Sequence, residues 1–281
     1  MAIESVHRAS DSPYVARVWS GRVSGVEQMT SIATSTWELV FWDERGRPHA
    51  AVRGPETKVS TAAITGDSAS FGITFAHGAR MPHLPMGDLV DGAAESPNTT
   101  GRAFMLRGQE WEIPNLDNVE QFVGRLVREG VLVRDPLVDE VVWGGIAKVG
   151  SRSVQRRIAA STGLTQGAIR QIERARAAAV LLSGGAAPLE VVHRLGYYDQ
   201  PHLAKALQRF IGRTATQLGA RGEATDAMSL LYKAEELGRT LRELVAVIAP
   251  RTDEEGHALV REHDRHLRRR NHDRLHRAGC R

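Results

Sequence analysis

The stretch from Ser151 to Leu218 constrains the fold most strongly, because it contains helical segments separated by clear breaks. Within it, the run LEVVHRLGYYDQPHLAKALQRF is typical of a helix, a tight turn and a second helix. Gly196 stands at the break and tolerates the left-handed backbone of a turn. Asp199 and Pro201 stand where the cap and first turn of the next helix would lie. This is the layout of a helix-turn-helix, whose second helix lies in the DNA major groove.

The preceding residues predict three further helices. Asp135 and Pro136 begin the first with an N-cap carboxylate and a proline at the first helical position. A second runs from Ser151, as its cap, to Gly163. A longer connector over 166–182 leads to the break before the helix-turn-helix. The expected buried positions are Val154 and Ile158, then Ile169, Ile172, Ala175, Ala179 and Leu182, and finally Leu203, Ala206, Leu207 and Phe210.

Basic charge is concentrated in this helical half. Residues 142–221 carry 12 Lys and Arg against 3 Asp and Glu, a net charge of +9. Residues 1–134 carry 13 against 16, a net charge of −3, so the overall value of +4 for the 281 residues hides the asymmetry. Clustered cations release condensed counterions from a phosphate backbone and thereby favour nucleic acid. A solvated charged face is the alternative interpretation of the same charge.

The polar sides of the two short basic helices supply candidate contacts to DNA. Gln and Arg carry forked donors that read adenine and guanine edges in the major groove. Lys and Arg can instead hold phosphates, which gives affinity without sequence information. An ordinary solvated helix face does not require a tight-turned helix at this spacing. The candidates are Arg152, Ser153, Gln155 and Arg156 in the first helix, and Gln200, His202, Lys205, Gln208 and Arg209 in the second.

The first half of the chain favours strands. Residues 1–12 are expected to be a disordered lead without a signal peptide. From Tyr14 to about Phe104, the runs YVARVW, VEQMTSIAT, WELVFW, AAVRG, KVSTAAIT and SFGITFA are rich in β-branched and aromatic residues, and DERGR predicts a hairpin turn. This spacing favours a small β-barrel or sandwich. A helix with an apolar stripe over 116–127 follows and ends near Gly130.

Histidines in the first half raise the question of a metal site. A metal-binding cupin is expected to show two histidines one residue apart, followed by a glutamate, and His49, His77 and His83 do not form that cluster. Surface or singly hydrogen-bonded histidines are therefore favoured, and no cofactor is expected. The sequence shows no Ser-His-Asp spacing and no glycine-rich phosphate loop. Cys280 is the one cysteine, which excludes an internal disulfide and a zinc site built from several cysteines.

Two runs in the helical half, SVQRRIAASTGLTQGAIRQIERARAAAVLL and LGYYDQPHLAKALQRFIGRT, carry a resemblance to a known family. Over roughly residues 136–218 the chain resembles the DNA-binding domain of AraC/XylS-type transcriptional regulators. The resemblance implies two helix-turn-helix units, joined by the connector helix, that enter successive major grooves on one DNA face. The first half is more loosely similar to the sensor-like domain of one branch of this family, which implies a small cupin-like barrel. The runs that carry this similarity are WELVF, GP at Gly54-Pro55, GITFAHGA and FVGRLVREGVL. The implied base-reading residues are Arg152, Gln155 and Arg156 in the first unit and Gln200, His202 and Lys205 in the second.

Three positions depart from the pattern of this family. Val192 stands where alanine is usual, and its larger side chain is expected to widen the packing of the second unit. Ala215 replaces a usual proline, and Ile158 replaces a common phenylalanine. Beyond Leu218 the chain is longer than in this branch, and we expect a helical to disordered basic tail over 222–281.

The sequence thus predicts an α+β protein with a small cupin-like β-barrel followed by an all-α double helix-turn-helix domain. The expected function is sequence-specific, non-enzymatic regulation of transcription in the cytoplasm, on double-stranded operator DNA. Three further partners are open: a small-molecule effector, RNA polymerase and a second copy of the chain. We expect no association with a membrane, because no run of about 18 apolar residues occurs. The expected parts are the disordered lead over 1–12, a sensor or dimerisation barrel with a C-terminal helix over 13–134, the DNA-binding domain over 135–221, and the tail over 222–281.

Three other classes of function remain open at this point. A metal-dependent cupin enzyme with an accessory helical domain would need a ligand cluster that the sequence does not show. A DNA-repair alkyl-acceptor protein can carry a similar DNA-binding domain but needs a reactive cysteine, for which Cys280 in a polar tail is a poor candidate. An adaptor that binds protein through its helices would show no salt-dependent affinity for DNA.

Overall fold

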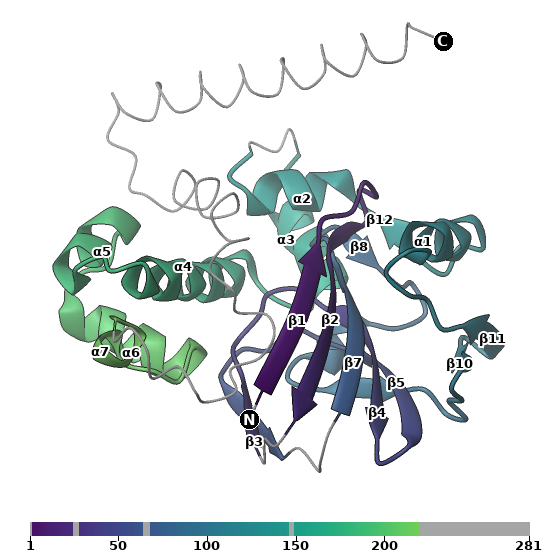
Figure 1. Ribbon diagram of the computed structural model, residues 1–281. Coiled ribbons are helices and arrows are strands. Elements are labelled where there is room, and N and C mark those ends of the chain that lie inside the picture. Colours follow the sequence, from purple (N-terminus) through teal and green to yellow (C-terminus); the bar gives the residue numbers. More distant parts are fainter. Residues whose placement is uncertain (1, 25–27, 64–67, 146–148, 220–281) are drawn as a thin grey trace, which may run out of the picture.

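The first half of the chain folds around an antiparallel sheet and the second half is helical, so the protein has α+β structure (Figure 1). The computed structural model describes residues 2–24, 28–63, 68–145 and 149–219. The expected tail over 222–281, with Cys280, lies outside the described residues. Within the described part, none of the helices combines the length and the apolar character needed to cross a membrane.

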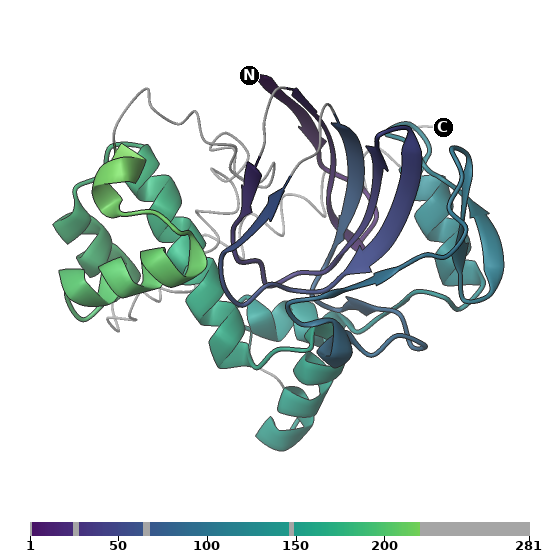
Figure 2. The ribbon, with the colours of Figure 1, turned by 90° about the horizontal axis from the view of Figure 1, so that it is seen from below.

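Six strands form the main sheet, and every neighbouring pair is antiparallel. The spatial order is β1 (Ala2–Arg8), β2 (Val15–Ser24), β7 (Ser68–Phe75), β4 (Glu38–Glu44), β5 (Arg47–Arg53) and β9 (Ala93–Glu95). The sheet is strongly curved (Figure 2). Among the described strands, β1 and β9 are the two edges and do not pair with each other, so the sheet is not shown to close into the expected barrel.

Three two-stranded pairs surround this sheet. They are β3 (Gln28–Ser31) with β6 (Ser60–Ala63), β8 (Ala79–Arg80) with β12 (Val133–Arg134), and β10 (Ala103–Leu106) with β11 (Gln109–Glu112). The six strand-like runs of the sequence all contain a strand, which confirms that part of the prediction. The expected turn in DERGR is also confirmed: Arg45 and Gly46 have φ angles of 55° and 75° between β4 and β5. Two residues with positive φ are what a tight hairpin of this length requires.

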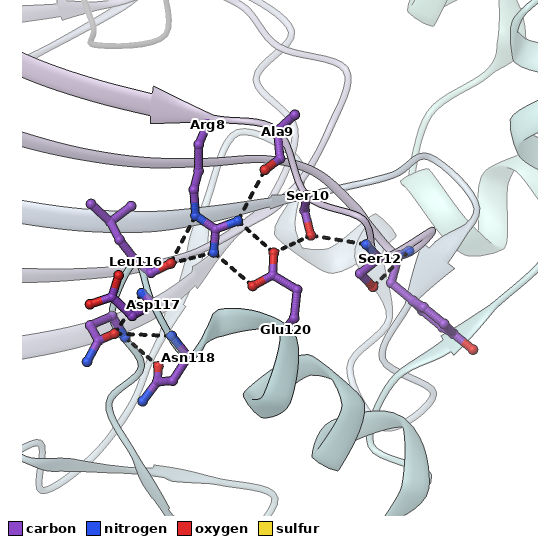
Figure 3. A network of polar contacts seen from close by, with 10 residues as sticks. Arg8, Ala9, Ser10, Ser12, Leu116, Asp117, Asn118 and Glu120 are labelled. Carbon is purple, nitrogen blue, oxygen red and sulfur yellow. Dashed lines mark hydrogen bonds and ion pairs between the residues drawn. The ribbon is translucent and has the colours of Figure 1, made fainter. Parts of the chain in front are cut away.

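The expectation of a disordered lead over residues 1–12 is wrong, because Ala2–Arg8 forms β1 and pairs with β2 along its whole length. A polar cluster around Arg8 fixes the end of this strand (Figure 3). The guanidinium donates to both carboxylate oxygens of Glu120, at 2.7 and 2.8 Å, and to the carbonyl of Leu116 at 2.9 Å. Ser10 donates to the same carboxylate at 2.7 Å. The hydrogen bonds to its carboxylate, of which those from Arg8 have the largest effect, lower the pKa of Glu120 to about 2.

The helix α1 (Val119–Arg128) packs one apolar side into the core beneath the sheet. Phe122 meets Phe104 and Trp111 at ring-centroid distances of 6.2 and 6.1 Å. Deeper in the same core, Trp37 and Phe75 stack with centroids 4.0 Å apart. The expected helix is thus confirmed, although it begins three residues later than 116, and the glycine at its end, Gly130, has the expected positive φ of 66°.

Six helices make up the second half within the described residues. They are α2 (Pro136–Val142), α3 (Ser151–Thr162), α4 (Gln166–Ser183), α5 (Pro188–Leu195), α6 (Gln200–Phe210) and α7 (Ala215–Gly219). The cap at Asp135 is confirmed, since its carboxylate accepts from the amide of Leu137 at 3.2 Å. Ser151 was expected to cap α3, but the cap is Gly150 and Ser151 lies in the first turn. A glycine cap leaves the first amides of the helix without a side-chain acceptor.

The helices share a buried core that follows the predicted apolar positions. Val154, Ile158, the five connector residues and three of the four α6 positions are buried, while Ala206 is partly buried against them. Val192, the large residue at the helix crossing, is also buried in this cluster. Ile32 and Ala33, from the segment between β3 and β4, belong to the same cluster. The first half of the chain therefore contributes directly to the core of the helical half.

Candidate nucleic-acid interface

A tight turn joins α5 to α6 as the sequence predicts. Gly196 ends α5 with a φ of 66°, a backbone angle that residues with a Cβ adopt only at a cost in free energy. The carboxylate of Asp199 accepts from the amide of His202 at 2.7 Å and so caps α6, and Pro201 occupies the first turn. Tyr197 is buried within the turn. The local geometry of helix, turn and helix is therefore confirmed.

The outer side of α6 is polar and open to solvent. Only Leu203, Leu207 and Phe210 are buried, and they form one stripe along the helix. The five predicted contact residues of α6 are all exposed, and the helix contains no Asp or Glu. Because a single stripe is used for packing, more than half of the circumference is available to a partner.

His202 also has a role inside the turn. Its Nδ1 accepts from the backbone amide of Tyr198 at 3.4 Å, and its ring lies edge-on to Tyr197 with centroids 5.2 Å apart. An Nδ1 that accepts requires the proton on Nε2, so the neutral ring presents an Nε2–H donor to a partner. The sequence did not single out Tyr198, which is 91% exposed beside this ring. An aromatic residue in a turn gives no periodic signal by which its exposure could be predicted.

Arg209 differs from the other candidates because it lies at the end of α6 that meets the first half. Its guanidinium lies 5.0 Å from the ring centroid of Phe210. Its backbone carbonyl accepts from the amide of Val59 at 2.9 Å. Gln200, His202 and Lys205 lie in the first two turns, away from this contact. The N-terminal part of α6 is thus the part that lies away from this contact with the first half.

The helix α3 shows the same division of faces. Val154 and Ile158 are buried, Arg152, Gln155 and Arg156 are exposed, and Ser153 is half-buried. This helix also contains no acidic residue. It packs against the first half, since Gly163 at its end lies so close to the backbone of Met86 that a Cβ would be 2.6 Å from the Met86 carbonyl oxygen.

Cations in the helical half fall into two groups. Several are held by internal partners: Arg157 makes two bonds to Asp135 at 2.5 and 2.8 Å, Arg194 pairs with Glu190 at 3.8 Å, and Arg174 lies over the ring of Tyr197. In contrast, Arg152, Arg156 and Lys205 form no ion pair with any residue that the structure describes. The cations at the predicted contact positions are therefore available to an external anion.

The connector α4 separates α3 from the α5–α6 pair (Figure 1). Its 18 residues give a length of about 27 Å. The two units differ in their internal connection: residues 143–150 join α2 to α3, whereas only residues 196–199 join α5 to α6. The second pair therefore has the shorter connection in the sequence.

A second polar cluster is buried where α4 meets the first half. The hydroxyl of Ser35 donates to the carboxylate of Glu173 and lies 2.8 Å from Nε2 of His77. Since that hydroxyl has one hydrogen, it accepts from Nε2–H of the histidine. Burial lowers the pKa of His77 below its ordinary 6.5, against the opposing influence of Glu173 and Asp139. The serine, not the imidazole, is the central member, which is not the order of a serine hydrolase.

The other histidines of the first half lie apart from this cluster. His49 stacks on Trp42 with ring centroids 5.0 Å apart, and His83 is exposed. In the described part of the chain, no three His, Cys, Asp or Glu side chains are grouped as metal ligands.

Comparison with known proteins gives no relative. No family model matches the chain, and neither the curated proteins nor the solved structures contain a match. A function must therefore be argued from the side chains themselves. The strongest local feature is the capped turn before α6 and the exposed, acid-free face that follows it.

Proposed function

We propose that the chain is a sequence-specific DNA-binding regulator of transcription of the AraC/XylS type. The observation that carries the proposal is α6, a helix that follows a tight capped turn, buries one stripe and exposes a polar face without acidic residues. In this proposal α5 and α6 form one helix-turn-helix unit and α2 and α3 form another. Arg152, Arg156 and Lys205, which form no ion pair within the described residues, supply the electrostatic affinity for phosphates.

The roles of the side chains follow from their positions. The N-terminal part of α6 enters the major groove, where Gln200 can make two hydrogen bonds to an adenine edge. His202 presents its Nε2–H beside it, and Lys205 contacts a base or a phosphate one turn later. In α3, Gln155 and Arg156 have the corresponding roles. Arg209 lies at the bound end of α6 and is assigned to the DNA backbone rather than to bases.

The first half of the chain is proposed to be a cupin-like sensor or dimerisation unit. The antiparallel sheet and its covering helix α1 supply the scaffold. Such a unit regulates DNA binding by shifting an equilibrium between competent and incompetent arrangements, and an effector can shift it only by its differential affinity for the two. Operator affinity that is the same with every effector tried would contradict the sensing role.

Selection of bound genomic fragments tests the DNA-binding proposal. Wild-type protein is expected to enrich fragments that share a sequence motif. The variants Gln155→Ala and Lys205→Ala are compared with Gln121→Ala and Arg128→Ala, which remove an exposed glutamine and an exposed cation from α1. Loss of preference at particular base positions supports base reading, and a uniform loss assigns the residue to a phosphate. Failure of wild-type protein to enrich any motif would overturn the proposal.

A further inference from the structure

The C-terminal end of α6 is held by backbone groups of the first half. The last carbonyls of an α-helix have no partner within the helix. Here the carbonyl of Phe210 accepts from the amide of Ala33 at 2.8 Å, and that of Arg209 accepts from the amide of Val59 at 2.9 Å. Two residues far away in the sequence therefore provide donors for the last two carbonyls of the helix.

The same segment also holds the connector α4. The carbonyl of Ala33 accepts from the guanidinium of Arg176 at 3.0 Å. Arg176 lies 3.6 Å from the carboxylate of Glu173, which in turn accepts from Ser35. Arg176 and Glu173 are largely buried, with exposed side-chain fractions of 12% and 13%. Ala33 thus bonds to α6 through its amide and to α4 through its carbonyl.

Close packing accompanies these bonds. Ile32 and Ala33 are completely buried in the cluster that contains Leu207 and Phe210. Gly212, just after α6, has a φ of 75°, and a Cβ there would lie 2.9 Å from a methyl carbon of Val59. Such contact leaves little room for α6 to move without moving the segment over 31–36.

The segment is tied in turn to the main sheet. Thr34 and Glu56 exchange backbone hydrogen bonds at 3.0 and 2.9 Å, and Ser31 donates to the carboxylate of Glu56 at 2.6 Å. Arg53, at the end of β5, lies 3.3 Å from Glu56 and 3.7 Å from Glu38. Glu38 is buried in β4 and accepts from the indole of Trp19. A continuous chain of polar contacts therefore runs from the sheet to α6.

We infer that the segment over 31–36, together with Val59, is a positioning element that fixes the orientation of α6 relative to α4 and the sheet. The reading of DNA by α6 rests on the proposed function, whereas the docking of α6 rests on the contacts above. In a regulator, this element makes the second reading helix part of the same rigid body as the sheet. Arg176 is the positioning residue that joins the element to α4.

Hydrogen exchange measures the docking without any DNA. The variant Arg176→Met removes both polar contacts and keeps most of the apolar stem, and Arg176→Lys keeps the charge. We expect exchange at the amides of Ala33 and Val59 to rise by about tenfold or more in Arg176→Met, as for the loss of a charged hydrogen bond. The rise should be smaller in Arg176→Lys, and amides of the β10–β11 pair should not change. Unchanged exchange at Ala33 and Val59 would overturn the inference.

Ser35→Ala provides a second variant should Arg176→Met fail to fold. It removes the hydroxyl that joins Glu173 to the segment and leaves the Arg176 bond to Ala33 in place. A smaller rise in exchange at Ala33, with a cooperative thermal transition retained, is the expected result. Exchange identical to wild type at both amides in this folded variant would count against the positioning role.

The spacing of DNA half-sites measures the positioning itself. One inserted base pair moves a half-site by about 3.4 Å and rotates it by about 34°. Wild-type protein should lose about tenfold or more in affinity for the altered site, and Arg176→Met should lose less because α6 is free to follow. Equal discrimination by both proteins would contradict the positioning role.

If wild-type protein binds no DNA, the proposed function fails, and the exchange result alone decides whether α6 is docked.

Discussion

Internal partners decide which cations of this chain are available to an external anion. Arg157 makes two hydrogen bonds to the carboxylate of Asp135, so its charge is neutralised and it contributes little to the binding of an external anion. Its neighbours Arg152 and Arg156 project from the same helix without an ion pair in the described residues. Counting basic residues alone would treat the three as equal, whereas the geometry separates them.

This difference predicts the salt dependence of binding. Each cation that neutralises a phosphate contributes about 0.9 to the slope of log affinity against log salt concentration. Arg156→Ala and Lys205→Ala should therefore each reduce the slope by about that amount, as measured by fluorescence anisotropy between low and high salt. Arg128→Ala on α1 is the matched control and should leave the slope unchanged. A slope identical to wild type in the first two variants would assign their charges to solvent.

His77 predicts a pH dependence of stability. Burial lowers the pKa of this ring below its ordinary 6.5 in the folded state. As the pH falls below 6.5, the unfolded chain takes up a proton that the folded protein resists, so the folded state loses stability. Urea unfolding at pH 7.5 and at pH 5.5 should show a larger loss for wild type than for His77→Gln. An equal loss in both proteins would mean that other groups cause it.

At the scale of elements, one ion pair joins the end of β1 to α1. The pKa of Glu120 is lowered to about 2, mainly by the hydrogen bonds from Arg8. The ionised Glu120 carboxylate therefore stabilises the folded state above pH 4.5, and this stabilisation is lost as the pH falls from 4.5 towards 2. Arg8→Ala should flatten this dependence and accelerate hydrogen exchange in the β1–β2 ladder, while the β4–β5 ladder is unchanged. Unaltered β1 exchange would show that the strand pairing alone holds β1.

The cap of α6 gives a second prediction for an element. Asp199→Ala removes the acceptor for the amide of His202 and should destabilise the protein by about 1 kcal/mol. Asp199→Asn retains a side-chain oxygen and should change stability by much less. Chemical denaturation of the three proteins is the measurement. A loss as large in Asp199→Asn as in Asp199→Ala would indicate that the negative charge, and not the cap, is responsible.

The elements that could be predicted are those specified by neighbouring residues. Asp199, Gly196 and the apolar stripe of α6 lie within one short stretch, and the structure confirms each of them. The strand β1 was missed because its order comes from pairing with β2 and from Arg8 meeting Glu120, which is distant in the sequence. The same reason explains why the Ser35, Glu173 and Arg176 contacts were not foreseen.

At the scale of the whole molecule, the sequence suggests a first half and a second half joined in series, and the structure joins them through a common core. Ile32 and Ala33 lie among the helices, and Arg176 reaches back to the first half. Charge asymmetry and helix order could indicate which half is proposed to bind DNA, but neither carries information on how the halves pack. Tertiary packing of this kind depends on residues that are far apart in the chain.

Hydroxyl-radical footprinting of wild-type protein on a selected fragment tests the central claim most directly. If α3 and α6 are the two reading helices, two protected windows should lie on one face of the DNA, about one helical turn apart. Substitution of Gln155 by Ala should weaken one window, and substitution of Lys205 by Ala should weaken the other. A single window, or two windows that both variants leave unchanged, would contradict the assignment of α3 and α6 as the DNA-reading helices.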